Sequence, residues 1–308
     1  MTNRTAQRKR AATANAKAGN GRRRSNVRGR RPATSRYRTG AVAAIGAVLA
    51  IVVAMVAFSA VNDDGSPATP GTGRGGKVVA AVTSVPASAL DAVGGGQGIA
   101  PPVAIAAGAP PLTAGGKPQI LYVGAEYCPF CASERWPLVI ALSRFGTFSG
   151  LGLTTSSASD VYPSTPTLTF HGSTYTSDVI SFTAVETNTN QLVGQGYEPL
   201  ETPTAEQQRL LQRFDAPPYT SQAGVIPFTL IGNRFVITGS SYPPDVLQGK
   251  TWGQIASALS DPSSPIAKQV LAAANMLTAA FCELTSGQPS NVCTAPGVTS
   301  AAASLPSA

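Results

Sequence analysis

The feature that most constrains this chain is an uncharged run near its start, AVAAIGAVLAIVVAMVAFSAV, at positions 41–61. Ser59 is the only strongly polar side chain in these 21 residues. A helix of this length rises about 30 Å, which matches the hydrocarbon core of a bilayer. We therefore predict one transmembrane helix over 41–61. A cleaved signal peptide, cut within AFSA at 57–60, is the alternative, although its apolar region and basic leader are usually shorter.

The charge of the chain changes at that run. Residues 1–40 contain 13 of the 23 Lys and Arg residues and no Asp or Glu, which leaves 10 basic and 15 acidic residues in 41–308. The net charge of +8 therefore describes one tail and does not indicate a nucleic-acid-binding domain. The positive-inside rule keeps this tail in the cytoplasm and places everything after residue 61 outside it, at the cell membrane.

The basic tail, 1–40, is expected to be disordered. One interpretation is that it only fixes the topology, and the other is that it also contacts anionic lipid headgroups. Tyr37 is its only aromatic residue, so nothing in the tail favours stacking on bases. No specific nucleic-acid partner is expected.

Composition divides the remainder into a linker, a domain and a tail. Residues 62–116 are rich in Gly, Pro, Ala, Ser and Thr, as in NDDGSPATPGTGRGG, which predicts a flexible linker. Within it, KVVAAVTSV and SALDAV are interpreted as a short strand and a helical turn at the edge of the domain. An ordered domain is expected over 117–293, and the small residues of 294–308 predict a disordered tail.

The first half of the domain is predicted to be a βαβ unit. PQILYVGA, at 118–125, is an apolar run of strand length without alternation, which suits a central strand covered on both faces. The segment PFCASERWPLVIALSRFG has helical periodicity, and Gly146 is a plausible end for that helix. LGLTTSS, at 151–157, then reads as the second strand.

The second half of the domain is predicted to be a ββα unit that follows an insertion at about 157–222. A helix-start signature lies at 202–206 within this insertion. Two strands, 225–231 and 234–239, flank a Gly232-Asn233 turn. Helices at 251–259 and 265–284 close the domain. The fold class is therefore α/β, with a mixed sheet flanked by helices.

Two of the four cysteines form the motif Cys-Pro-Phe-Cys, at Cys128 and Cys131, where the predicted strand meets the helix. A helix N-terminus presents free N–H groups and a partial positive charge, and both stabilise a thiolate. Because only the thiolate attacks a disulfide, Cys128 at the exposed end is the predicted nucleophile and Cys131, one turn inward, the resolving cysteine. Pro129 suits the first helical turn, where no N–H is required. A static disulfide is the competing interpretation.

Other titratable residues add little to this pair. Glu126 and Glu134 flank the motif, and either is a candidate proton carrier or an ordinary exposed carboxylate. His171 is the only histidine, and its Thr- and Ser-rich setting favours a structural or surface role. A Cys/His protease is therefore poorly supported.

Cys282 and Cys293 are separated by ten residues that cross a helix end and a Gly-Gln-Pro turn. A structural disulfide that ties the C-terminal loop to the last helix is the leading interpretation. A second redox pair that exchanges with the first is the alternative. A zinc ion bound by all four cysteines is a third option, but the spacing fits no common zinc module. No metal and no cofactor is expected.

The strand, the Cys-Pro-Phe-Cys turn and the helix resemble the active site of the thioredoxin superfamily. In that fold a cis-proline begins the strand next to the redox pair, and Pro227 matches its position. The resemblance therefore implies a cis peptide between Ile226 and Pro227, beside Cys128. It covers about 117–260, interrupted by the insertion.

The chain also resembles a membrane-anchored family described as domain of unknown function 929. The matching stretches are YCPFCASERWPL, STPTLTFHGSTYTSD, TPTAEQQRLL and FCELTSGQPSNVC. This resemblance supports the thioredoxin-like assignment and the second cysteine pair.

These observations predict a membrane-anchored, extracytoplasmic thiol–disulfide oxidoreductase. Its partners would be protein thiols or disulfides and a further redox protein. Pro129 and Phe130, between the cysteines, and Ile226 are the expected substrate contacts. The competing class is a binding module on a thioredoxin-like scaffold with two structural disulfides, which would present 157–222 to a partner.

Overall fold

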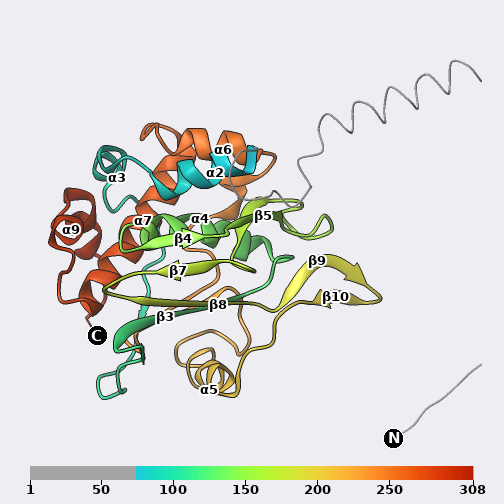
Figure 1. Cartoon of the computed structure of the whole chain (residues 1–308), viewed down its shortest axis with the longest axis horizontal. Coiled ribbons are helices and arrows are strands. Elements are labelled where there is room, and N and C mark those ends of the chain that lie inside the picture. The colour runs from blue at the N-terminus through green and yellow to red at the C-terminus, as the bar shows by residue number, and fades with distance from the viewer. Residues whose placement is uncertain (1–73, 308) are drawn as a thin grey trace, which may run out of the picture. The chain divides into compact units, whose positions relative to one another are not determined.

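The computed structural model describes residues 74–307, which are built around one central mixed sheet (Figure 1). Its elements in chain order are α2 (Arg74–Thr83), α3 (Ala87–Val93), β1 (Val103–Ala104), β2 (Thr113–Ala114), β3 (Lys117–Gly124), α4 (Pro129–Ser143), β4 (Thr147–Ser149), β5 (Gly152–Thr155), β6 (Pro166–Thr169), β7 (Thr174–Thr176), β8 (Ser181–Glu186), β9 (Asn188–Val193), β10 (Gly196–Pro199), α5 (Ala205–Phe214), β11 (Phe228–Ile231), β12 (Phe235–Thr238), a 3₁₀ turn at Pro244–Leu247, α6 (Trp252–Ala258), α7 (Pro265–Leu284), α8 (Ser290–Cys293) and α9 (Pro296–Ala302).

The central sheet has the strand order β1-β12-β11-β3-β2, and β8 also pairs with β3. On one side of β3, β11 runs antiparallel, with Leu230 opposite Leu121. On the other side, β8 runs parallel along residues 119–124, and β2 contacts only 117 and 118. The predicted α/β class, a mixed sheet flanked by helices, is confirmed.

Helices cover both faces of this sheet. Ile120 and Tyr122 of β3 contribute to a large core shared with α2, α4, α6 and α7. Leu121 and Val123, which point the other way, contribute to a smaller core that includes residues of α5. Figure 1 shows α5 on the opposite side of the sheet from α4 and α7. Burial on both faces is what the unbroken apolar run of β3 predicts.

α4 is buried along almost its whole length. The indole Nε1 of Trp136 donates to the carbonyl of Pro166 over 3.0 Å, and the hydroxyl of Thr167 donates to the carbonyl of Ala132 over 2.7 Å. These bonds fix β6 against the helix, and α7 packs along it. The helix that carries the Cys-Pro-Phe-Cys motif is therefore held from several sides.

The second strand of the βαβ unit is not the one predicted at 151–157. Those residues include β5, which pairs antiparallel with β6 in a separate two-stranded sheet. The parallel partner of β3 is β8, which lies within the stretch predicted to be an insertion, 157–222. Parallel strands require a long crossover. Here the crossover contains α4 and the two small sheets β4–β7 and β5–β6.

The predictions for the second half of the domain agree with the structure. β11 and β12 form the hairpin, and Gly232 and Asn233 in its turn both have positive φ, 61° and 58°. Ile231 pairs with Phe235, so Arg234, predicted to begin the second strand, lies in the turn. Thr204 caps α5 through a capping box, in the region of the helix-start signature. α6 and α7 lie where helices at 251–259 and 265–284 were expected.

The structure differs from the predicted linker and tail. From residue 74 onward, 62–116 contains α2 and α3, whose Val82 and Leu90 are buried in the main core. Likewise, α9 lies in the predicted tail 294–308, and its Val298 and Ala301 are buried against α7. The strand predicted for KVVAAVTSV is wrong, because these residues belong largely to α2, whereas the helical turn predicted for SALDAV is present as α3. The high content of small residues suggested a linker and a tail, although small residues also allow close packing between helices.

The predicted tail 1–40, the predicted transmembrane helix 41–61 and the first part of the predicted linker lie outside the described residues. Between 74 and 307, no single helix has both the length and the apolar character needed to cross a membrane. One bent pair, Gly75–Thr83 with Ala87–Val93, meets those two criteria jointly.

Candidate redox site

Cys128 lies where the chain turns from the central strand into the buried helix. β3 ends at Gly124, α4 begins at Pro129, and Cys128 is the N-cap residue of that helix. Its Sγ accepts a hydrogen bond from the backbone N–H of Cys131, with an N–S distance of 3.2 Å. The sulfur therefore satisfies one of the N–H groups that a helix start leaves without a partner.

The two cysteines of the motif have different environments. Both are free thiols, Cys128 with 4% of its surface exposed and Cys131 with none. The hydrogen bond from the Cys131 thiol, together with the Cys131 N–H and the charge of Arg135, lowers the pKa of Cys128 against the opposing effect of burial. Burial raises the pKa of Cys131 well above its usual range. Of the two thiols, Cys128 therefore loses its proton more readily, although it is less exposed than the sequence suggested.

The segment before β11 lies against Cys128. The Cys128 Sγ is 3.8 Å from the carbonyl oxygen of Ile226. The peptide bond between Ile226 and Pro227 is cis, as the resemblance implied. β11 then begins at Phe228, which is opposite Val123 of β3. The structure thus brings Ile226 and Pro227 to the redox pair from a part of the chain almost 100 residues away.

Arg135, four residues after Cys131 in α4, forms a buried ion pair with Glu186, the last residue of β8. The guanidinium of Arg135 donates to both carboxylate oxygens of Glu186, from Nε over 2.8 Å and from Nη2 over 2.6 Å. Nη2 also donates to the carbonyl of Ala125, over 2.8 Å. Both side chains are completely buried. This fork geometry holds a fixed positive charge in the interior, beneath the motif.

Two polar atoms of this buried cluster have no hydrogen-bond partner among residues 74–307. They are Nη1 of Arg135 and the hydroxyl of Tyr122. The guanidinium carbon lies 5.8 Å from the centre of the Tyr122 ring. Burial raises the pKa of Tyr122 well above its usual range, so its hydroxyl stays protonated. Unpartnered buried polar groups are uncommon and cost stability, which makes this cluster a candidate for a functional role.

Sequence reasoning missed Arg135, Glu186 and Tyr122. Arg135 directly precedes the apolar run WPLVI, and that setting is the only signal that it is buried. Glu186 ends β8, the strand that the sequence did not assign to the central sheet. Without that assignment, nothing places its carboxylate beside the helix.

The other predicted titratable residues have different positions. Glu134 is fully buried rather than exposed, and it accepts hydrogen bonds from the N–H and the hydroxyl of Ser241, over 2.7 and 2.8 Å. Burial raises its pKa to about 7. Glu126 is half-buried and accepts a hydrogen bond from the Thr154 hydroxyl, over 3.4 Å. His171 is a surface residue with Nδ1 2.7 Å from a carboxylate oxygen of Glu201.

The two residues between the cysteines, Pro129 and Phe130, differ in their exposure to solvent. Pro129 is buried at the first position of α4. Phe130 has 39% of its surface exposed, and its ring meets the ring of Tyr162 edge-on, with centroids 6.0 Å apart. Of these two predicted substrate contacts, only Phe130 faces solvent.

Cys282 and Cys293 form a disulfide, with their Cα atoms 5.6 Å apart, which links the end of α7 to α8. The disulfide anticipated for this pair is therefore present. Because these two sulfurs are bonded to each other, they do not form a four-cysteine zinc site with Cys128 and Cys131.

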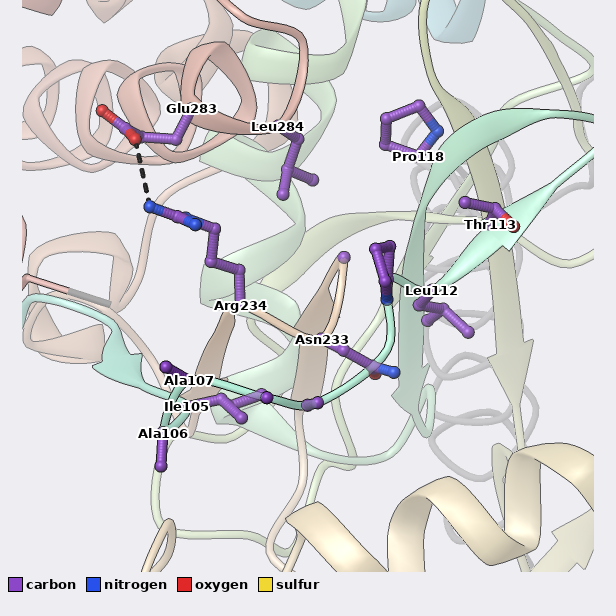
Figure 2. A pocket seen from close by; sticks show the side chains of 14 residues that line it. Ile105, Ala106, Ala107, Leu112, Thr113, Pro118, Asn233, Arg234, Glu283 and Leu284 are labelled. Carbon is purple, nitrogen blue, oxygen red and sulfur yellow. Dashed lines mark ion pairs between the residues drawn. The ribbon is translucent and has the colours of Figure 1, made fainter.

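A pocket of about 320 Å³ lies at the other end of the central sheet (Figure 2). Pro118 at the start of β3 and the hairpin turn at Gly232 and Asn233 line it, together with Arg234 and Glu283. The last two form an exposed ion pair, with 3.6 Å between Nη2 and the carboxylate oxygen. No residue of the Cys-Pro-Phe-Cys motif lines this pocket, so it is separate from the redox pair.

Comparison with known proteins gives a family and no function. The family model that matches is described as Domain of unknown function (DUF929), and it covers residues 105–283. No curated protein and no solved structure matches the chain. The matched range contains β3, α4, β8, β11 and β12, and with them both cysteines of the candidate site. The chain belongs to the DUF929 family.

Proposed function

We propose that this protein is a thiol–disulfide oxidoreductase with a thioredoxin-like fold, tethered outside the cytoplasm by its N-terminal apolar segment. The observation that carries the proposal is the asymmetry of the Cys-Pro-Phe-Cys pair. Cys128 caps a helix, accepts hydrogen bonds on its sulfur and has a lowered pKa, whereas Cys131 is buried with a raised pKa. A nucleophilic and a resolving cysteine need this difference.

The sheet supports the thioredoxin-like part of the proposal. β3, α4 and β8 form a parallel βαβ unit, and β11 with β12 forms an antiparallel hairpin on the other side of β3. The redox pair follows β3 directly, and Ile226 before β11 lies against Cys128. These are the positions that the resemblance implies for the two cysteines and for Pro227.

In the reducing direction, the Cys128 thiolate attacks one sulfur of a substrate disulfide. A mixed disulfide forms, and the other substrate sulfur leaves as a thiolate that takes up a proton. Cys131 then loses its proton and attacks the Cys128 sulfur, which releases the second substrate sulfur and leaves a Cys128–Cys131 disulfide. Two electrons have then passed from the pair to the substrate, and the two protons on the product thiols come from Cys131 and from solvent. In the oxidising direction every step is reversed.

Several features keep Cys128 ready for this attack. The N–H and the thiol of Cys131 both hydrogen-bond its sulfur, and the charge of Arg135 acts on it from below. Arg135 is itself fixed by Glu186 and by the carbonyl of Ala125. We assign to Arg135 a positioning and electrostatic role.

The proposed partners are protein thiols or disulfides and a further redox protein that restores the pair. The proposed location outside the cytoplasm is consistent with the Cys282–Cys293 disulfide, because disulfides persist in oxidising compartments. The basic tail would then lie on the cytoplasmic side, near anionic lipid.

Trapping of mixed disulfides tests the proposal. In the Cys131→Ser variant the second step is blocked, so mixed disulfides through Cys128 should accumulate and be visible on a non-reducing gel and by mass spectrometry. The Cys128→Ser variant is the matched control and should trap nothing. If Cys131→Ser also traps nothing, and Cys128 resists alkylation after mild reduction, a non-catalytic binding module is the better description.

A further inference from the structure

Two segments outside the central sheet flank the redox motif. One is the part of the β5–β6 loop at residues 157–165, and the other is the β9–β10 hairpin, residues 188–199. We call them the two arms. In Figure 1 the β9–β10 hairpin projects from the rest of the domain.

The β9–β10 hairpin is joined to the motif through Tyr127, the residue before Cys128. The rings of Tyr127 and Tyr197 are stacked, with centroids 4.0 Å apart and planes 5° from parallel. Leu192 is the cross-strand partner of Tyr197. Because directly opposed residues share one face of a hairpin, Leu192 lies on the same face as the tyrosine that contacts the motif.

The β5–β6 loop is joined to the motif at two points. The N–H of Ser157 donates to the carbonyl of Tyr127 over 2.8 Å. Further along the loop, Tyr162 meets the exposed ring of Phe130, which lies between the two cysteines. Val161, next to this tyrosine, is 63% exposed. This loop therefore approaches the redox pair from another part of the chain.

The exposed large apolar side chains of the domain are concentrated at the Cys-Pro-Phe-Cys motif and at these two arms. Within residues 74–307, five large apolar side chains are exposed, and only Val103 lies elsewhere, on β1 at the edge of the sheet. The other four are Phe130, Val161, Leu192 and Val193. Single exposed apolar residues are ordinary, but a group on the motif and on the two segments that contact it indicates a binding surface.

The charge of the arms helps to identify the occupant. Residues 157–165 and 188–199 contain no Lys, Arg or His, and their acidic residues are Asp160 and Glu198. Small thiols such as glutathione carry carboxylates, for which these arms offer no cation. An apolar polypeptide segment, by contrast, matches the exposed Phe130, Val161, Leu192 and Val193.

We propose that the two arms bind an extended, apolar segment of a polypeptide substrate on either side of its cysteine, and so present that cysteine to Cys128. This inference rests on the proposed function, because it names the substrate class of the same site. Its consequence is selectivity: apolar polypeptides react faster than small disulfides, and the difference depends on the arms rather than on the two cysteines.

The test uses two mixed disulfides of thionitrobenzoate, whose release is coloured. One carries glutathione, and the other carries a peptide with leucine, valine and phenylalanine around its single cysteine. The full chain is solubilised in detergent, reduced and then assayed. In the double variant Leu192→Ser, Val193→Ser, the rate with the apolar peptide should fall about tenfold, as loss of contact with two such side chains implies. The rate with glutathione should stay the same.

Val103→Ser is the matched control, since it also removes one exposed valine but lies on β1, and it should leave both rates unchanged. If the double variant and the wild type react with the apolar peptide at equal rates, the inference is overturned. Reaction of both proteins with the glutathione probe would in that case still support an oxidoreductase. If the wild type releases no colour from either probe, the proposed function fails, and the inference fails with it. Because the substituted residues are exposed, these variants should remain folded.

Discussion

At the scale of single residues, we predict that the buried charge of Arg135 adds to the hydrogen bonds from Cys131 in lowering the pKa of Cys128. Replacement of Arg135 alone would leave the Glu186 carboxylate buried without a partner, which typically costs about 3–5 kcal/mol. The informative variant is therefore Arg135→Met, Glu186→Gln, which removes both charges. In this variant we expect the pH profile of Cys128 alkylation to shift to higher pH. The alkylation rate at pH 7 should fall about three- to tenfold.

Arg135→Lys is the control for that measurement. It keeps a positive charge but not the planar fork, so stability should fall while the pH profile of alkylation stays near that of the wild type. A profile that is identical in the neutral double variant and the wild type would assign Arg135 a purely structural role.

Because Glu134 is buried, we predict that the free energy of unfolding falls as the pH rises. Burial raises its pKa from 4.5 to about 7, so the folded state binds the proton more tightly than the unfolded state does. Its contribution to stability is complete below pH 4.5 and is lost as the pH rises through 7. The unfolding free energy should therefore fall over this range, by up to about 3 kcal/mol.

The Glu134→Gln variant tests this dependence by urea denaturation at several pH values. Glutamine is neutral, yet it can still accept from the N–H of Ser241 and donate to its hydroxyl. The variant should match the wild type near pH 4.5 and exceed it at pH 8. Glu206→Gln, at an exposed position in α5, serves as the control. Parallel pH curves for Glu134→Gln and the wild type would contradict the prediction.

At the scale of elements, the sequence predicted those whose signals are local. The central strand is an unbroken apolar run, and the helix over 265–284 begins with a proline after a serine N-cap. The hairpin is specified by Gly232 and Asn233, which tolerate positive φ. In each case, neighbouring residues are enough to determine the structure.

The elements that sequence reasoning missed are determined by distant contacts. β8 becomes a central strand only because it pairs with β3, about 60 residues earlier. α2 and α9 are rich in small residues, which suggest a linker unless their packing partners are known. Hydrophobic pattern alone cannot reveal a partner that lies far away in the chain.

The candidate site divides in the same way. Cys128, Cys131 and Pro227 could be predicted, because a motif and a resemblance name them. The buried cluster of Arg135, Glu186 and Tyr122 could not, since its position depends on the placement of β8. The two arms were included in the predicted insertion, but nothing in the sequence placed Tyr197 against Tyr127.

At the scale of the whole molecule, the two ends of the described chain meet on α7. The side chain of Asn275 donates to the carbonyls of Leu90 and Gly94, over 2.8 and 2.9 Å. The N–H of Gly297 donates to the carboxylate of Asp91 over 3.0 Å. A Cβ on Gly297 would lie only 2.6 Å from the carbonyl oxygen of Leu90. Segments 74–104 and 294–307 are thus parts of one domain, and α3 packs on α9 and α7.

The position of the second cysteine pair bears on its role. Cys282 lies beside Glu283 and Leu284, and these two residues line the pocket at the Pro118 end of β3 (Figure 2). Cys128 follows the opposite end of the same strand. An eight-residue strand spans about 25 Å. Direct exchange between the two pairs would require a large rearrangement, which favours a structural role for the Cys282–Cys293 disulfide.

The double variant Cys282→Ser, Cys293→Ser distinguishes the two roles. The disulfide closes a short loop, with a sequence separation of 11, so its loss should lower the unfolding free energy by about 2–3 kcal/mol. It should also loosen α9, which hydrogen exchange would detect first. Trapping through Cys128 and repeated turnover with a reductant should both persist. A variant that keeps its stability and its single turnover but loses repeated turnover would instead show that the second pair passes electrons to the first.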